Sequence, residues 1–194
     1  MANWAITNYT IEGNIESLEK INDAILNHSV EYKSSDNWEG NILDALGIDF
    51  REKLPDGKDK FYIRGFIMDN PSFDKANGIL SFYAEEAWRQ TDFHILLEQK
   101  FKDIKVYFCC EEPDCDVFVT NDKKGKYYPE RYLVDCCINN DYKHEYFKTK
   151  KDTYAFIKNI SMCKNEKDVE EFNEVNSSLG LNDFINVYKY SIIE

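Results

Sequence analysis

The alternation of apolar and polar positions predicts strands and helices in turn over the first part of the chain. Residues 3–11 are rich in β-branched and aromatic types and lead to a glycine, which is typical of a strand and a turn. Residues 14–27 space their apolar side chains like one face of a helix, with Asn14 available as the N-cap. A polar loop at 28–37 and a short helical segment within 37–50 are expected next.

The central part of the chain predicts two strands, a helix and a further strand. The two strands are expected at 60–68 and 78–88, with a turn between them. Residues 91–101 carry apolar side chains at helical spacing, with Thr91 as the candidate N-cap, and a strand follows at 104–110. The resulting order is the βαββαβ pattern of a ferredoxin-like α+β sandwich, in which two helices cover one face of an antiparallel sheet.

Two further segments add strands to this core. The stretch VYFCCEEPDCDVFVTND, residues 106–122, is typical of a β-hairpin whose turn is EEPD. Residues 126–138 predict one more strand, and their early proline suits an edge or entry position. We therefore expect residues 1–138 to form a ferredoxin-like core with added hairpin strands.

The C-terminal part of the chain predicts a helical or βα extension packed on the same domain, residues 139–194. A short strand is expected at 145–149, and helices are expected at 149–161 and 165–180. The tail at 184–193 is aromatic and β-branched and predicts a final strand.

Three stretches carry a resemblance to a known family. The opening MANWAITNYTIEG and the later LSFYAEEAWRQ, followed by a helix and KVYFCCEEPDCDVFVTND, resemble the YubB-like ferredoxin-like domain proteins. That family typically opens with Met-Pro-Asn-Trp, so the chain departs at Ala2, and it lacks the family's proline-rich step after Trp88. The resemblance covers residues 1–122 and leaves 139–194 outside. It implies a bacterial setting associated with plasmids, phages or other mobile elements, and it implies no activity.

Composition narrows the classes of partner. The chain has 24 Lys and Arg against 36 Asp and Glu, a formal charge of −12, which argues against binding to the phosphate backbone of nucleic acid. The N-terminal residues have no signal-peptide pattern, and no apolar run approaches the roughly 18 residues of a membrane span. We expect a cytoplasmic protein with reduced cysteines and no membrane partner.

The cysteines are the first candidates for chemistry. Cys109 and Cys110 are consecutive in a predicted strand, so their side chains should point to opposite faces. A zinc site is conceivable, and its candidate ligands are Cys110, Cys115, Cys136, Cys137 and His144. No second Cys-x₂₋₄-Cys knuckle accompanies Cys110 and Cys115, and cysteine is often a small buried hydrophobe. The simple hairpin interpretation is therefore preferred, and no cofactor is expected.

A second group of polar residues lies where the strand at 78–88 leads into the next helix. Its members are Glu85, Glu86, Trp88, Arg89, Asp92 and His94. A carboxylate and an imidazole can exchange protons near neutrality, but nothing places a nucleophile or an oxyanion donor beside them. Phosphate-binding loops, zinc-protease and serine-hydrolase motifs are absent from the sequence. No catalytic residue is assigned, and we expect the protein not to be an enzyme.

These observations favour a non-catalytic binding or accessory protein that acts through protein–protein contacts, with a protein partner or a homo-oligomer. The candidate interaction residues are Trp88, Arg89, Tyr127 and Tyr128, of which the tyrosines lie in the basic stretch KKGKYYPER. Two alternatives remain open: a metal-binding protein that uses the hairpin cysteines, and an acidic DNA mimic that inhibits a nucleic-acid enzyme.

Overall fold

The computed structural model describes residues 3–28 and 38–193, and in this part of the chain it is an α+β protein with five α-helices. Contacts divide the chain into two units: unit one comprises Met1–Asp122 with Ile193–Glu194, and unit two comprises Lys123–Ile192. Most of the polar loop expected at 28–37 lies outside the described residues. No helix among the described residues has the length and apolar character needed to cross a bilayer.

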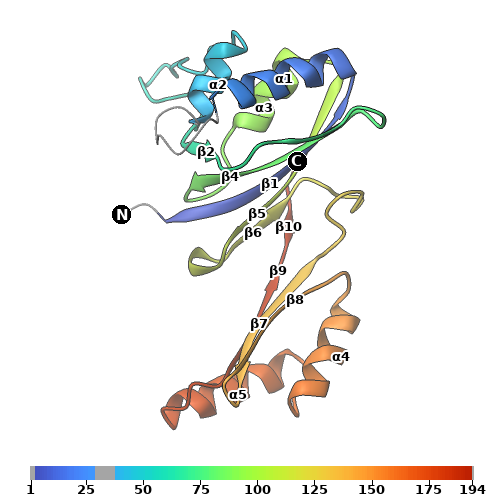
Figure 1. Cartoon of the computed structure of the whole chain (residues 1–194). Coiled ribbons are helices and arrows are strands. Elements are labelled where there is room, and N and C mark those ends of the chain that lie inside the picture. The colour runs from blue at the N-terminus through green and yellow to red at the C-terminus, as the bar shows by residue number, and fades with distance from the viewer. Residues whose placement is uncertain (1–2, 29–37, 194) are drawn as a thin grey trace. The chain divides into compact units, whose positions relative to one another are not determined.

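Unit one is built on one large sheet (Figure 1). Within this unit the strand order is β6-β5-β1-β4-β2, and β3 also pairs with β4. The central strand β1 pairs antiparallel with β4 on one side and with β5 on the other. The strands are β1 (Trp4–Gly13), β2 (Gly65–Ile67), β3 (Ser72–Asp74), β4 (Ile79–Ala87), β5 (Ile104–Glu112) and β6 (Val117–Thr120). The short strand β10 (Ser191–Ile192) belongs to the residues of unit two.

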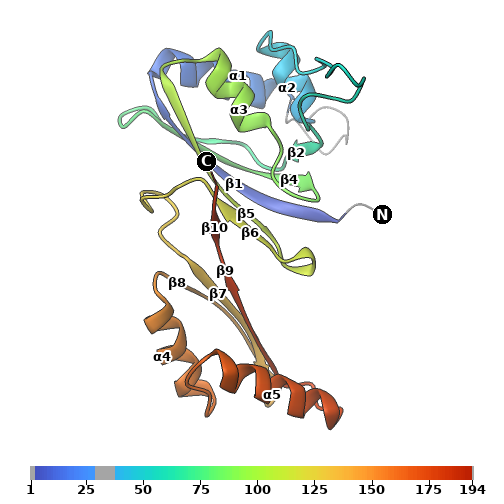
Figure 2. The same cartoon turned by 180° about the vertical axis from the view of Figure 1, so that it is seen from behind.

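Three helices cover one face of this sheet, as both cartoon views show (Figures 1 and 2). They are α1 (Ile15–His28), α2 (Glu39–Ala45) and α3 (Phe93–Lys100). The two-residue period of β1 explains the sidedness, because Ala5 and Tyr9 join the buried core while Trp4 and Ile6 stay exposed. The predicted cap of α1 is confirmed, since Asn14 Oδ1 accepts a hydrogen bond of 2.9 Å from the backbone of Glu16.

The strand expected at 60–68 is wrong in length, because β2 covers only Gly65–Ile67. The backbone of Tyr62 is engaged elsewhere: its N–H donates to the Asp92 carboxylate at 2.7 Å, and its carbonyl accepts from the Asp92 N–H at 2.8 Å. This pair of bonds ties residue 62 to the start of α3 instead of to a neighbouring strand. The expected cap of α3 also differs, because the N-cap position is Asp92 and not Thr91.

The hairpin around EEPD is present with different bounds. Strand β5 continues to Glu112, and a 3₁₀ turn, η1 (Pro113–Cys115), precedes β6. Asp116 has φ 54°, a left-handed conformation that delays the second strand until Val117. Cys115 therefore lies in the turn and not in a strand opposite Cys110, whose cross-strand partner is Val119.

Unit two is a smaller α+β assembly. Its strands β7 (Tyr132–Ile138), β8 (Asp141–Phe147) and β9 (Phe184–Lys189) form an antiparallel sheet in the order β8-β7-β9. Helices α4 (Lys150–Ile160) and α5 (Glu166–Ser178) supply the other half of its core. That core contains Val134, Cys136, Ile157, Cys163, Val169 and Ile185.

Local signals in the sequence explain the helices of unit two. Thr149 Oγ1 accepts a hydrogen bond of 3.1 Å from the backbone of Asp152, as the predicted capping pattern requires. Asn165 Oδ1 caps α5 in the same way through the Asp168 N–H at 3.1 Å. The chain after α5 turns at Gly180, which has φ 66°.

The boundary between the units differs from the expected one. A division after Ile138 would fall inside the β7–β8 hairpin, whereas the contacts divide the chain after Asp122. Asn139 and Asn140 have φ 54° and 64°, the pair of positive values that a two-residue type I′ turn needs. This turn joins β7 to β8, so β7 belongs to the C-terminal unit and not to the sheet of unit one.

Candidate functional site

Two carboxyl groups are buried together on the helix-covered face of unit one. Glu86 comes from β4, and Glu39 is the first residue of α2; both are fully buried. Gly65, which pairs with Glu86 in the neighbouring strand, lets them approach, because a Cβ there would lie 2.7 Å from Glu39 Cδ. Any side chain at position 65 would collide with the Glu39 carboxyl group.

Hydroxyl groups surround the Glu86 carboxyl. Tyr9 Oη donates to Glu86 Oε1 at 2.6 Å, and Thr7 Oγ1 donates to Glu86 Oε2. Thr91 Oγ1 lies 2.8 Å from Glu86 Oε1 and 2.9 Å from Glu39 Oε2. A hydroxyl has one proton, so Thr91 can donate to only one of the two glutamates.

Burial and hydrogen bonding together favour a neutral Glu39. Burial, reinforced by the neighbouring Glu86 carboxylate, raises the pKa of Glu39 well above its usual value. When Glu39 is neutral, its carboxyl O–H donates a hydrogen bond to Thr91 Oγ1, and the Thr91 hydroxyl in turn donates to Glu86. The other Glu39 oxygen, Oε1, has no hydrogen-bond partner among the described residues, as suits the less demanding carbonyl oxygen of a neutral acid.

This network joins β1, β4, α2 and the segment before α3, and it has no access to solvent. His94, the imidazole of the polar group noted in the sequence, lies in the core beside the Phe108 ring, with 4.7 Å between ring centroids. Its Nδ1 is 3.0 Å from the Thr91 carbonyl, and burial lowers its pKa. Because the side chains of the network are buried and bonded to one another, we interpret the network as structural.

The polar group predicted around the end of β4 is therefore dispersed. Glu86 is buried, whereas Glu85 points to the opposite face, and Asp92 bonds the backbone of Tyr62. Trp88 has φ 71° and is 47 % exposed, and Arg89 is also exposed. Thr7, Tyr9 and Glu39 were missed; the strand parity of β1 and β4 could have placed the first two beside Glu86, but nothing local marks Glu39.

The candidate metal ligands occupy different environments. Cys109 and Cys110 point to opposite faces, as expected, and burial raises the pKa of Cys110 to about 12. Cys115 is exposed, and its Sγ accepts a hydrogen bond of 2.9 Å from the Asn3 side chain. Among the described residues no three His, Cys, Asp or Glu side chains gather in a group that could hold a metal ion.

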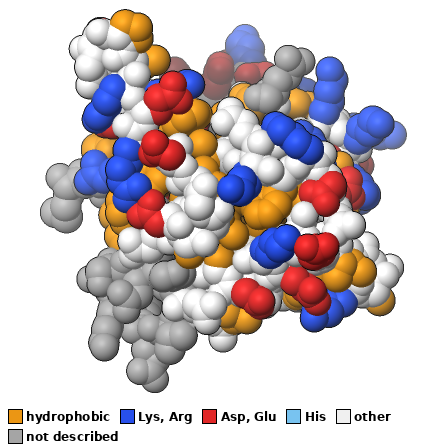
Figure 3. Space-filling view, turned by 90° about the horizontal axis from the view of Figure 1, so that it is seen from above, with side chains coloured by type: hydrophobic (Ala, Val, Ile, Leu, Met, Phe, Trp, Pro, Cys, Tyr) orange, Lys and Arg blue, Asp and Glu red, His pale blue; other side chains and the backbone are white. Residues whose placement is uncertain are grey.

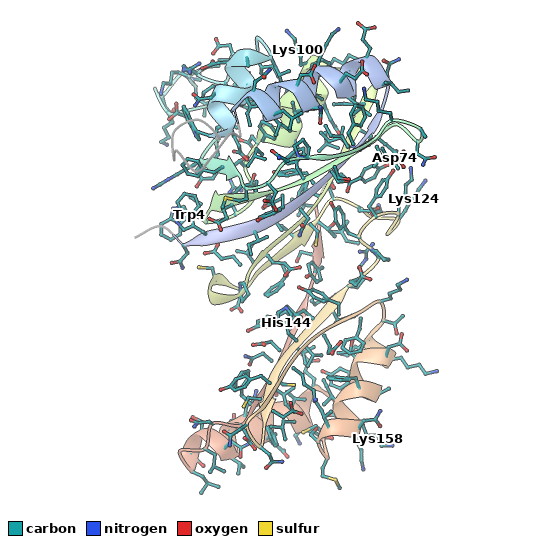
Figure 4. All side chains as sticks on the ribbon, viewed as in Figure 1. Trp4, Asp74, Lys100, Lys124, His144 and Lys158 are labelled. Atoms are coloured by element: carbon teal, nitrogen blue, oxygen red, sulfur yellow. The ribbon has the colours of Figure 1, made fainter. Side chains whose placement is uncertain are left out.

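The remaining candidate ligands lie in unit two. Cys136 points into the core beneath the helices, and Cys137 lies on the other face of β7 beside Tyr142. His144 is on β8, labelled in Figure 4, with Nδ1 3.5 Å from the Asp135 carboxylate. Zinc binding stays a prediction, and these side chains do not indicate how a site would be assembled.

The helix-free face of unit one carries exposed apolar residues at the start of β1. Trp4 and Ile6 are 42 % and 50 % exposed, and Figure 4 labels Trp4 at this end of the strand. The register places Ile6 between Glu85 of β4 and Glu111 of β5. Phe66 lies beyond Glu85, and its ring centroid is 5.7 Å from that of Trp4. We call these five residues the Trp4–Ile6 patch.

The two predicted interaction tyrosines lie before β7 and are partly buried. Lys126 Nζ is 4.9 Å from the centroid of the Tyr127 ring, and Arg131 Nη1 donates to the Tyr128 carbonyl at 2.6 Å. Two of the basic side chains of this stretch, Lys126 and Arg131, thus contact the residues around the tyrosines.

Charge is mixed on the helix-covered face of unit one. Figure 3 shows acidic and basic side chains interspersed there, with hydrophobic side chains visible between them.

Comparisons of the chain with protein-family models, curated proteins and solved structures return no match. Function must therefore be argued from the sites themselves.

Proposed function

We propose that unit one is a protein-binding module whose contact surface is the Trp4–Ile6 patch. The observation that carries the proposal is the half-exposed Ile6, held in the middle of a sheet face between two carboxylate-bearing strands. A flat sheet surface with an aromatic and an aliphatic anchor is typical of the centre of a protein interface, where a few residues supply most of the binding energy.

The charges around the anchors favour a basic partner. Glu85 and Glu111 flank Ile6, and the chain as a whole carries a formal charge of −12. A partner surface with an apolar centre and a rim of Lys or Arg would be electrostatically complementary, and attraction of this kind raises the rate of association. The occupant is accordingly a basic protein and not a second copy of this acidic chain.

The finer assignment of the fold belongs to the same proposal. The strand order β5-β1-β4-β2, with α1 and α3 on one face, supports a ferredoxin-like core in unit one. We keep the YubB-like relationship, the bacterial mobile-element setting and the cytoplasmic location as proposals. They agree with a non-catalytic accessory role for the module.

Site-specific photocrosslinking tests the proposal. A photoreactive amino acid is placed at position 6 in cells that express the chain, and a matched control carries it at position 95. Ile95 on α3 is 38 % exposed on the other side of the unit, so it controls for a half-exposed isoleucine. We expect position 6 alone to capture a protein of basic isoelectric point. Equal capture at both positions, or capture of an acidic protein at position 6, would contradict the proposal.

A further inference from the structure

A cavity in unit one, distinct from the Trp4–Ile6 patch, gathers positive charge in an otherwise acidic chain. It has a volume of about 490 Å³ and lies between the segment 50–64 and the segment 89–92. This volume is in the range of small-molecule sites. Its lining includes four cationic side chains, Arg51, Lys60, Arg64 and Arg89.

Two of these cations are neutralised by carboxylates. Both terminal nitrogens of Arg51 bond the Asp44 carboxylate at 2.6 Å, and Lys60 bonds Glu52 at 2.7 Å. These pairs leave little of either charge for a ligand.

Arg64 and Arg89, unlike Arg51 and Lys60, form no ion pair with a carboxylate of the described residues. Both side chains are exposed, and neither has an ion-pair partner within 4.0 Å among the described residues. Of the two carboxylates that line the cavity, Asp59 pairs with Lys53, whereas Asp92 accepts from the Tyr62 N–H and keeps its negative charge. The cavity therefore presents two guanidinium groups that form no ion pair with a carboxylate among the described residues.

Tyr62 lies in the wall of the cavity together with Arg64 and Arg89. The Arg89 guanidinium carbon is 5.6 Å from the centroid of the Tyr62 ring. The positive charges of Arg64 and Arg89 both act on the Tyr62 hydroxyl, opposing the rise in its pKa that burial causes. That hydroxyl donates to the Ala87 carbonyl, which fixes the ring in the wall of the cavity.

We propose that this cavity binds a small phosphate ester that carries a planar ring, of the size of a mononucleotide. Guanidinium groups match the oxygens of a phosphate in a bidentate geometry. The aromatic side chains that line the same cavity, Phe50, Phe61 and Tyr62, supply an apolar wall for the ring. The phosphate lies against Arg64 and Arg89, and the ring lies against this wall.

The test is an NMR titration of the ¹⁵N-labelled full chain with AMP at constant ionic strength, with adenosine and inorganic phosphate as separate probes. We expect saturable shifts of amides lining the cavity, and weaker binding of both partial probes. The Arg64→Gln/Arg89→Gln variant should weaken AMP binding at least tenfold. Arg64→Lys/Arg89→Lys, which keeps the charge but loses the planar fork, should lie between it and the wild type.

Lys58→Gln is the matched control. Lys58 is an exposed cation of the same unit, paired with Asp56 at 3.0 Å, and it does not line the cavity. We expect this change to alter AMP affinity less than twofold. Absence of cavity shifts at about 10 mM AMP, a range that still detects very weak sites, would overturn the proposal. So would equal weakening by Lys58→Gln, or adenosine or inorganic phosphate binding as tightly as AMP.

Discussion

Replacing Glu39 by glutamine should stabilise unit one above the usual pKa of a glutamate and have little effect below it. The Glu39 carboxyl is fully buried beside the Glu86 carboxylate, and burial together with this neighbour raises its pKa above the usual value of 4.5. A raised pKa means that the folded state holds the proton more tightly than the unfolded state. The stability that comes from neutral Glu39 is therefore complete below pH 4.5 and is lost as the pH rises through the folded-state pKa.

The magnitude follows from proton linkage. Between the unfolded and folded pKa values of Glu39, the free energy of unfolding falls by about 1.4 kcal/mol for each pH unit relative to a chain without this group. Glutamine at position 39 cannot ionise, and its amide group can still donate to Thr91 Oγ1, so the variant escapes this loss. The variant should match or fall below the wild type near pH 4.5 and exceed it near pH 8.

Urea unfolding of the wild type and Glu39→Gln, measured from pH 4.5 to 8, tests this expectation. The partly exposed Glu19, which pairs with Lys75 at the surface, provides the matched control Glu19→Gln, whose difference from the wild type should change little over the same range. A Glu39→Gln difference that is independent of pH would refute the proton accounting. A wild type that gains on the variant as the pH rises would show that Glu39 is ionised in the folded protein.

Three further changes test separate parts of the structure. Gly65→Ala should destabilise unit one by about 1–3 kcal/mol, because its Cβ would lie 2.7 Å from Glu39 Cδ; an unchanged urea midpoint would contradict this contact. Asn140→Gly should stabilise unit two by about 0.5–1 kcal/mol, since residue 140 has φ 64°, and thermal unfolding that shows a loss would argue against the type I′ turn. In native protein a thiol reagent should modify exposed Cys115 well before Cys110, whose burial raises its pKa to about 12. Mass spectrometry of the labelled peptides measures this order, and earlier labelling of Cys110 would contradict its burial.

The elements that depend on local signals could be predicted from the sequence. The helix caps at Asn14 and Thr149, and the alternation along β1, are each decided by residues within a few positions of one another. The division into two units could not be found in the same way. It depends on β9 pairing with β7 across a gap of more than 40 residues, and on reading Asn139 and Asn140 as a tight turn.

The candidate sites illustrate the same limit. Exposure of Trp4 follows from strand parity alone, but its contact with Phe66 requires the register of β2 against β4. The cavity cations come from segments whose meeting depends on the two hydrogen bonds between Tyr62 and Asp92. Long-range backbone bonds of this kind leave no periodic trace in a single sequence.

The affinity of the partner captured at position 6 tests the central claim most directly. Its dissociation constant should be measured for the wild type, for Ile6→Glu and for Ile95→Glu. Ile6→Glu removes an apolar anchor and places a carboxylate against the apolar centre of the partner, where it would be buried without a cation, a loss on the order of 2 kcal/mol. We expect Ile6→Glu to weaken binding at least tenfold, and Ile95→Glu to leave it within twofold of the wild type. Equal affinities for all three proteins would contradict the assignment of the Trp4–Ile6 patch as the binding surface.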